Sequence, residues 1–367
     1  MPLTATCPRC LHALEFPILI EGERGNAWVR CESCELSIIF DHTGSDLSAA
    51  QSAAQLARHV EFPGYRLLGV IAIGGMGFLY SAVREKNRQL CALKTVPPEF
   101  MGYRSLLQRF RREAYTMRAL RHPGFLPLLE EAHNRTPPFF TMPFVAGRTL
   151  KQIIDERGRL TLDETAAVIV QLGESLHTLH QSGFVHRDVK PSNVLLGSRG
   201  EVLLFDFGVV QESTQQSDLT DEGMALGTPA YNAPETFERC ETSPQSDQYS
   251  LAVIIYQMLT GQLPMGVFPA PSAIARDLHE ESEAALLCAL AHDPGERHES
   301  VKHFTRHFHR PMLYQSTTSD NQRWIIRTLA EPTQEMLAIE PGYEAFPENE
   351  QREAGFNWLL KKLTGRK

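Results

Sequence analysis

Four cysteines near the N-terminus have the type and the spacing of a metal site. Cys7 and Cys10 form one Cys-x-x-Cys pair, Cys31 and Cys34 form another, and twenty residues separate the two pairs. Two intervening residues let a tight turn direct two thiolates at one ion, and two such turns complete the tetrahedron that Zn²⁺ prefers. A module of about 40 residues buries too little apolar surface to fold alone, so the metal would supply stability. Because four thiolates leave no open position, the spacing predicts structural rather than catalytic zinc.

Redox chemistry or disulfide pairing is the alternative for these cysteines. The chain opens with Met1-Pro2-Leu3-Thr4, which has neither the basic nor the apolar part of an export signal, so disulfides are not expected. Residues 1–41 resemble a zinc ribbon, in which segments 14–20 and 36–40 are expected to pair as short strands. They contain three arginines, no lysine and six carboxylates. That charge balance is poor for phosphate contact, so we expect a structural or protein-docking role and no nucleic acid.

A glycine-rich turn and a lysine follow in the next part of the chain. Gly74-Gly75-Met76-Gly77 lies between two apolar segments, and glycines there let the backbone close over phosphates without a Cβ in the way. A plain hairpin turn is the alternative. Lys94 lies on the next strand-like segment and Glu113 on the helical segment after it. A half-buried lysine needs a partner because an unpaired ammonium is costly to bury, whereas an exposed pair would be worth little.

Three longer motifs follow in the second half of the chain. They are His186-Arg187-Asp188-Val189-Lys190-Pro191-Ser192-Asn193, Asp206-Phe207-Gly208, and Gly227-Thr228-Pro229-Ala230-Tyr231-Asn232-Ala233-Pro234-Glu235. Together with the glycine turn and Lys94, in this order, they resemble the motif set of protein kinases. The resemblance covers about residues 64–310 and is narrower still to bacterial serine/threonine kinases of the eukaryotic type. It implies an α+β fold with a β-rich N-lobe and a helical C-lobe.

The resemblance also implies ATP and Mg²⁺ as cofactors and protein serine or threonine hydroxyls as acceptors. Asp188 would accept or orient the substrate proton, and Lys190 would offset charge on the transferred group. Lys94, oriented by Glu113, would hold the α- and β-phosphates. Asn193 and Asp206 would be the magnesium ligands, since both carry hard oxygens. The nucleotide would be contacted by Ile71, Ala72, Ile73, Gly74, Gly75, Met76, Gly77, Phe78, Leu79, Ala92, Lys94, Met142 and Val145.

The chain departs from the family pattern in a few places. Ala72 stands where the first glycine of the turn is usual, and its methyl group can restrict the loop. Pro143 replaces a usual glutamate but keeps the carbonyl that the family uses there. None of the departures removes a catalytic group, so an active kinase is expected. A pseudokinase or scaffold that docks partners through the ribbon and the tail is the alternative, and Ala72 is its support.

Regulation and two structural contacts also follow from the resemblance. Arg187 usually couples activity to a phosphate on the activation segment, because a phosphothreonine brings about −1.5 to −2 charge to a nearby cation. We expect autophosphorylation chiefly at Thr220, with Glu222 substituting in part. Asp247 would hold the catalytic loop. Arg297 would pair with Glu235 in a structural role.

The pattern also indicates the elements that position these residues. Strands are expected at 65–72, 78–84, 90–96, 126–130, 138–142 and 202–205. Capping boxes are expected to start helices at Ser105 and Thr161, and the nearly all-apolar segment 246–260 predicts a buried helix that ends at Gly261. His303, His307 and His309 fit an amphipathic terminal helix. A metal site at His303 and His307 is the weaker alternative, because no further ligand is visible.

Composition and length limit the remaining possibilities. The 367 residues are 42% hydrophobic and 22% charged, which is ordinary globular usage, and the net charge of −8 gives no basic excess for nucleic acid. No apolar run reaches the roughly 18–20 residues that span a bilayer, so a cytoplasmic location is expected. The expected organisation is a zinc-ribbon-like module at 1–41, a linker at 42–63, a kinase domain at 64–310 and a tail at 311–367.

Overall fold

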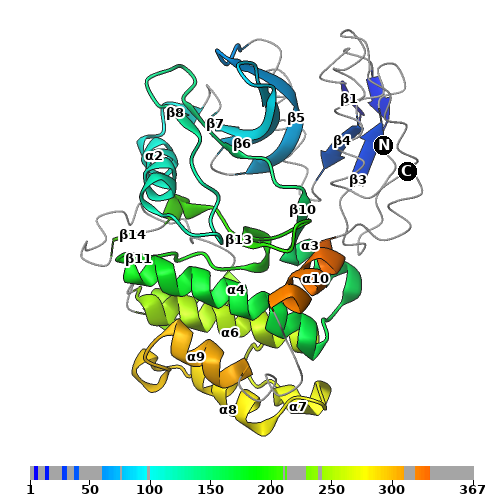
Figure 1. Ribbon diagram of the computed structural model, residues 1–367, viewed down its shortest axis with the longest axis vertical. Coiled ribbons are helices and arrows are strands. Elements are labelled where there is room, and N and C mark those ends of the chain that lie inside the picture. The colour runs from blue at the N-terminus through cyan, green and yellow to red at the C-terminus, as the bar shows by residue number, and fades with distance from the viewer. Residues whose placement is uncertain are drawn as a thin grey trace. The chain divides into compact units, whose positions relative to one another are not determined.

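The computed structural model describes residues 4–6, 13–15, 27–30, 37–40, 60–74, 77–96, 100–209, 211–212, 229–238, 242–309 and 319–330. Among them, residues before 108 and residues 129–144 form one compact unit, and residues 108–128 and 145–330 form the other. The first unit is built mainly from strands and the second mainly from helices (Figure 1). The four N-terminal cysteines and Thr220 lie outside the described residues.

Four short strands near the N-terminus form two hairpins. Strand β1 (Thr4–Thr6) pairs antiparallel with β2 (Ala13–Glu15), and β3 (Ala27–Arg30) pairs antiparallel with β4 (Ser37–Phe40). The expected pairing of 14–20 with 36–40 is therefore wrong. Each strand pairs with its neighbour in sequence, as favoured by the smaller entropy cost of closing a short loop.

The first unit also contains a five-stranded antiparallel sheet with the strand order β5-β6-β7-β9-β8. The strands are β5 (Tyr65–Gly74), β6 (Gly77–Arg84), β7 (Gln89–Thr95), β8 (Glu130–Ala132) and β9 (Phe139–Pro143). The expected strand at 126–130 is displaced, since β8 begins only at Glu130. Pro127 lacks the N–H that a ladder needs, so the apolar residues before β8 lie outside the sheet.

Aromatic side chains fill the core of this sheet. The buried cluster consists of Phe62, Tyr65, Phe78, Tyr80, Ala82, Cys91, Leu93 and Phe139. Phe62 and Phe139 meet edge to face with ring centroids 5.3 Å apart. At the start of β6, Gly77 has φ +135°, and a Cβ there would lie 2.2 Å from the Thr95 carbonyl oxygen. Glycine is therefore required where β6 approaches the backbone of β7.

Helices dominate the second unit, although α2 (Arg104–Ala119) begins just before its boundary. The others are α3 (Leu150–Arg157), α4 (Leu162–Gln181), α5 (Pro234–Glu238), α6 (Pro244–Thr260), α7 (Pro271–Ile274), α8 (Glu280–Ala289), α9 (Val301–His309) and α10 (Ser319–Ala330). The second unit also contains two small antiparallel sheets. One consists of β10 (Gly147–Thr149), β12 (Val194–Gly197) and β13 (Val202–Leu204). The other consists of β11 (Phe184–Val185) and β14 (Gln211–Glu212).

The helix signals of the sequence are partly confirmed. The Thr161 hydroxyl accepts from the backbone N–H of Glu164, and the Glu164 carboxylate accepts from the backbone N–H of Thr161, so this capping box is real. Helix α6 is buried on nearly all sides and ends at Gly261 in the left-handed conformation. The capping box at Ser105 is wrong, because α2 already begins at Arg104 and Ser105 lies inside the helix.

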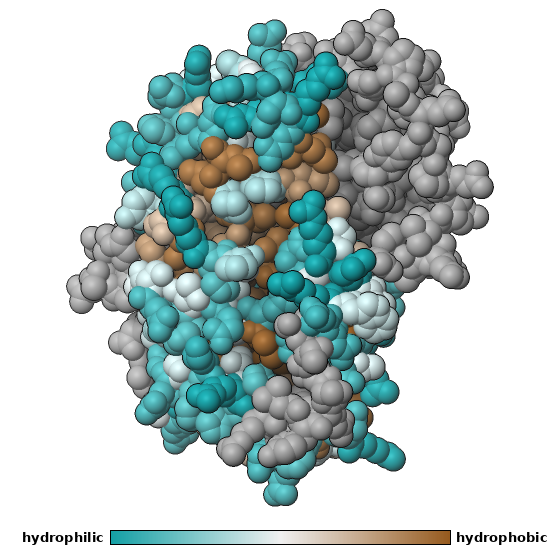
Figure 2. Space-filling view, in the orientation of Figure 1, coloured by the Kyte–Doolittle hydropathy of each residue, from teal (hydrophilic) through white to brown (hydrophobic). Residues whose placement is uncertain are grey.

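Helices α4 and α6 lie side by side at the centre of the second unit, and α8 and α9 pack against them (Figure 1). Helix α10, beyond the expected domain end at 310, packs against α4 and β12. Figure 2 shows that most of the visible surface of the described residues is hydrophilic, with hydrophobic residues gathered toward the middle of that face. Within the part of the chain that the structure describes, no helix is long and apolar enough to cross a membrane.

Candidate functional site

The loop between β11 and β12 brings a carboxylate, an ammonium and an amide together. The Lys190 Nζ donates to Asp188 Oδ2 over 2.7 Å. The Asn193 Nδ2 donates to the same Oδ2 over 3.0 Å and to the Asp188 backbone oxygen over 2.8 Å. A 3₁₀ turn at Pro191–Asn193 makes this possible, since it folds Asn193 back toward Asp188. Three sequence-predicted catalytic residues therefore form one connected cluster.

A buried carboxylate on α6 holds this loop by its backbone. Asp247, 1% exposed, accepts from the backbone N–H of His186 over 2.8 Å and of Arg187 over 2.9 Å. His180 Nε2 donates to it over 2.7 Å. Burial alone would raise the pKa of Asp247, but these hydrogen bonds and the charge of His180 lower the pKa overall. The expected role of Asp247 in holding the catalytic loop is confirmed.

His180 was not recognised from the sequence as part of this arrangement. It lies near the end of α4, where His177 precedes it by three positions, and neither histidine stands in a motif that distinguishes a functional group from a surface one. Only the packing of α4 beside α6 brings its ring to Asp247. With this contact, the Asp247 carboxylate accepts from the His180 ring and from the backbone N–H groups of His186 and Arg187.

Two residues of the site have unusual backbone conformations. Arg187 and Asp206 both have φ +69°, which costs energy for a residue with a Cβ. Arg187 is partly buried, and its buried Nε has no hydrogen-bond partner within the described residues. Burial lowers the pKa of Arg187 to about 10, with nearby Arg112 lowering it and Asp247 opposing that shift. Such a cation is well placed to attract an anion.

The Asp206-Phe207-Gly208 motif lies beside the catalytic loop. The backbone N–H of Phe205 donates to the Asn193 carbonyl over 3.1 Å, so the residues before Asp206 run next to Asn193. Phe207 is buried and meets Phe125 edge to face at 5.5 Å, and the His186 ring lies equally close to it. The two oxygen-bearing side chains predicted to bind magnesium therefore come from adjacent segments.

The sequence-predicted nucleotide residues of the sheet occupy β5, β6, β7 and β9. In the register of the sheet, Ala92 on β7 faces Met142 on β9, and both side chains are buried. Lys94 is half-buried on the same strand, two residues further on. Ala72 is exposed, whereas Phe78 is buried in the aromatic core. Gly75 and Met76 lie outside the described residues.

Two further predicted residues belong to the second unit. Glu113 on α2 is a buried carboxylate. Val145 is partly buried and directly precedes Ala146, whose carbonyl accepts from the backbone N–H of Ser198 over 2.8 Å. That bond anchors the segment at Val145 to the end of strand β12.

The family model for the protein kinase domain matches residues 65–331. The chain belongs to the protein kinase family. This match includes α10 and so extends past position 310, where we expected the domain to end. The crystal structure of the PknI kinase domain from Mycobacterium tuberculosis has a similar fold, with a TM-score of 0.54 and 28% identity over 68% of this chain and 97% of that one. The expected protein kinase fold, with a β-rich part and a helical part, is confirmed.

Curated relatives are bacterial serine/threonine-protein kinases. PknL of Mycobacterium tuberculosis is 30% identical over 64% of this chain and 62% of its own length. PknA of the same organism is 35% identical over 54% of this chain and 47% of its own length. A probable serine/threonine-protein kinase, pknA2 of Bifidobacterium longum, is 30% identical over 63% of this chain and 31% of its own length. The chain thus spans less than two thirds of the length of these relatives.

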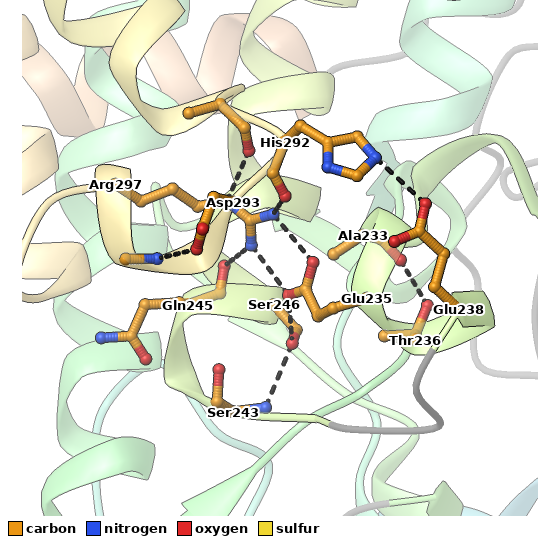
Figure 3. A network of polar contacts seen from close by, with 12 residues as sticks. Ala233, Glu235, Thr236, Glu238, Ser243, Gln245, Ser246, His292, Asp293 and Arg297 are labelled. Carbon is orange, nitrogen blue, oxygen red and sulfur yellow. Dashed lines mark hydrogen bonds and ion pairs between the residues drawn. The ribbon is translucent and has the colours of Figure 1, made fainter.

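A second polar network, shown in Figure 3, surrounds Arg297. The two terminal nitrogens of Arg297 each donate to one oxygen of Glu235 over 2.8 Å. Its remaining donors reach three backbone carbonyls, those of Gln245, Ala291 and His292. All five N–H groups of the guanidinium are therefore used. The expected pairing of Arg297 with Glu235 is confirmed, and its structural character follows from the lack of any spare donor.

Proposed function

We propose that this chain is an active serine/threonine protein kinase that transfers the γ-phosphate of ATP to protein hydroxyls. The observation that carries the proposal is the connected cluster of Asp188, Lys190 and Asn193, held from behind by Asp247. A scaffold that only binds nucleotide has no need for this arrangement, and every catalytic role of the family is filled in the chain. Lys190 at this position is the family's mark of serine/threonine acceptors.

The geometry supports a division of labour on the Asp188 carboxylate. Lys190 and Asn193 both donate to Oδ2, so the carboxylate is held in one orientation. We assign Oδ1 to the substrate hydroxyl, whose proton it would accept or orient as the oxygen attacks phosphorus. The Lys190 ammonium would then offset charge on the transferred group, because its stem is already fixed beside the reacting atoms.

The donor chemistry around Asn193 and Asp206 fits Mg²⁺. With its NH₂ group donated to Asp188, the Asn193 side chain presents an amide oxygen, and Asp206 presents carboxylate oxygens. These are the hard ligands that Mg²⁺ prefers, and bound Mg²⁺ would neutralise phosphate charge. We propose that Lys94, oriented by Glu113, holds the α- and β-phosphates. The nucleotide-contacting residues remain as predicted from the resemblance, although Phe78 is buried in the core of the sheet.

Substitution of the strand lysine tests this proposal. Lys94→Met should abolish transfer of labelled phosphate from Mg-ATP to a generic protein substrate while circular dichroism and the melting temperature remain close to wild type. Lys86→Met is the matched control, since Lys86 is exposed in the turn between β6 and β7. Full activity of a folded Lys94→Met chain would contradict the proposal. Tight ATP binding by wild type without any transfer would favour the scaffold.

We also propose that Cys7, Cys10, Cys31 and Cys34 hold one structural Zn²⁺. Two described hairpins support it, because one Cys-x-x-Cys pair lies in the connection between β1 and β2 and the other in the connection between β3 and β4. A hairpin connection is where a zinc knuckle directs two thiolates at an ion. Metal analysis of the full chain should find this zinc, and Cys10→Ser with Cys34→Ser should remove it. Cys288→Ser is the control, and equal zinc in all variants would exclude the site.

Regulation through Arg187 is the next part of the proposal. Its partly buried guanidinium, with Arg112 nearby and Nε unpaired within the described residues, supports an anion partner. We propose phosphorylated Thr220 as that partner, with Glu222 giving some activity before phosphorylation. Mass spectrometry after incubation with Mg-ATP should find phosphate on Thr220. Its absence, together with wild-type rates for Thr220→Ala, would refute the switch. The cytoplasmic location and a docking partner for the ribbon or the tail stay predictions.

A further inference from the structure

Three histidines gather on the outer side of α9. His303 and His307 lie one helical turn apart on α9, and His298 lies just before the helix. Each offers a ring nitrogen, and the three nitrogens lie within 4.8 Å of one another. The His298 and His303 Nδ1 atoms are 3.4 Å apart, and the His303 and His307 ring centroids are 4.1 Å apart. The structure thus supplies the third ligand that the sequence alone does not reveal.

Backbone carbonyls determine the tautomers of two of these rings. His298 Nε2 lies 2.9 Å from the Ala285 carbonyl oxygen, and because a carbonyl only accepts, Nε2 carries the hydrogen. His298 Nδ1, which faces His303 Nδ1, then carries the lone pair. In the same way His307 Nδ1 donates to the His303 carbonyl over 2.8 Å, which leaves the lone pair on Nε2. Metal-binding histidines typically donate their second nitrogen to such a carbonyl, which orients the ring.

The segment that carries His298 is already rigid. Its backbone N–H and C=O both bond the side chain of Gln248 on α6, over 3.1 Å each. Its ring stacks on Phe304 with centroids 5.3 Å apart and an interplanar angle of 19°. His303 and His307 are exposed, so their rings have room for small adjustments. An ion can therefore bind at a small entropic cost, because His298 is already fixed and the two exposed rings need little further ordering.

The distances fit a tetrahedral ion. Zn–N bonds are about 2.0–2.1 Å long, so two nitrogens on one tetrahedral ion lie about 3.3–3.4 Å apart. The His298 to His303 separation of 3.4 Å already has that value. All three ligand nitrogens lie within 4.8 Å of one another, so the exposed His307 side chain needs only a small adjustment to complete the set. Imidazole nitrogen is a borderline ligand that suits zinc and its first-row neighbours rather than magnesium or calcium.

We propose that His298, His303 and His307 form a site for a divalent first-row transition ion, with Zn²⁺ as the ion it takes in the cell. Three protein nitrogens leave the fourth position open to water or to a side chain of another molecule. The ion would link the segment after Arg297 to α9 and so stabilise the helical unit, because it binds only the folded arrangement. The site uses none of the groups assigned to phosphoryl transfer.

Zinc binding to the full chain tests this site. Protein freed of metal with a chelator is dialysed against increasing Zn²⁺, and the ions bound per chain are counted for wild type, His303→Gln and His307→Gln. Both substituted side chains are exposed, so the fold should remain intact. Zinc on the cysteine pairs is common to all these proteins and cancels in the comparison. The variants should hold one Zn²⁺ fewer, or bind it at least about 10–100-fold more weakly, since loss of even an outer-shell partner costs that much.

The matched control is His292→Gln, because that side chain is exposed in the preceding loop and lies outside the cluster. It should bind zinc as wild type does. Zn²⁺ should also raise the melting temperature of wild type and of His292→Gln more than that of the two cluster variants. Equal zinc binding by wild type and both cluster variants would overturn the proposal, and so would an equal loss in His292→Gln.

Discussion

Two buried carboxylates of the second unit, Asp247 and Glu235, differ in what their hydrogen bonds hold in place. Asp247 accepts from the backbone amides of His186 and Arg187, and thereby holds a loop whose side chains remain available. Glu235 gives both oxygens to Arg297, whose other donors are spent on carbonyls. The Asp188 and Lys190 side chains are 13% and 18% exposed, whereas that of Arg297 is 0% exposed. The proposed catalytic cluster thus keeps partly exposed polar side chains, whereas the Arg297–Glu235 network has no donor left to use.

Removing the Asp188 carboxylate should have the largest effect on rate and only a small one on stability. Asp188→Asn keeps the size of the side chain but cannot accept a proton, so kcat should fall about 10²–10⁴-fold. Its free energy of unfolding should fall by only about 1 kcal/mol, because an amide oxygen can still accept from Lys190 and Asn193, with the strength of a neutral hydrogen bond. Initial rates and urea denaturation measure the two quantities, with Asp155→Asn on α3 as control. A large loss of stability would show that the cluster is structural and would break the comparison.

Removing Arg297 should give the reverse pattern. Arg297→Ala leaves Glu235 buried without its partner, so the free energy of unfolding should fall by about 3–5 kcal/mol. Arg297→Lys keeps the charge but loses the fork of donors, so its loss should be intermediate. Urea denaturation measures both, with exposed Arg276→Ala as control. The Arg297→Ala molecules that remain folded should keep the wild-type catalytic rate. A variant that keeps wild-type stability but loses catalytic rate would contradict a structural role for Arg297.

Asp247→Asn should affect both quantities to a smaller extent. The loss of charged hydrogen bonds should cost about 1.5–3 kcal/mol at neutral pH and slow transfer by loosening the loop. The folded pKa of Asp247 is lowered, so its contribution is present above the usual carboxyl pKa and disappears as pH falls through the folded value. The stability gap between wild type and variant should therefore close in acid. Denaturation at several pH values measures it, and a constant gap, judged against exposed Asp163→Asn, would be contrary evidence.

The capping box of α4 should give the smallest effect and provides a baseline outside both networks. Thr161→Ala removes the hydroxyl that accepts from the backbone N–H of Glu164 and should cost about 1 kcal/mol. Thr161→Ser keeps the cap and should cost less. Neither change should alter kcat in the folded protein, which steady-state rates can check. A cost above that of Asp247→Asn would mean that the buried carboxylate matters less than its contacts suggest.

Sequence reasoning succeeded where the required groups are close together along the chain. Asp188, Lys190 and Asn193 lie within six positions, so a single turn at Pro191 brings them together. The Thr161 cap and the apolar helix α6 are equally local. It failed where short apolar segments have several possible partners, as in the hairpins of the N-terminal strands and in the residues around Pro127. Intrinsic strand preference is weak, and partner choice depends on packing that local pattern does not reveal.

The sequence by itself determined the family and the order of the motifs, and it supplied the proposed catalytic side chains, because these depend on residue type and short spacing. Only the tertiary structure decided which distant groups complete them. His180 reaches Asp247 across 67 positions, and Ala285 and Gln248 orient His298 across 13 and 50. Such contacts exist only after helices pack, since burial removes water and leaves each polar group to find a partner within the folded chain.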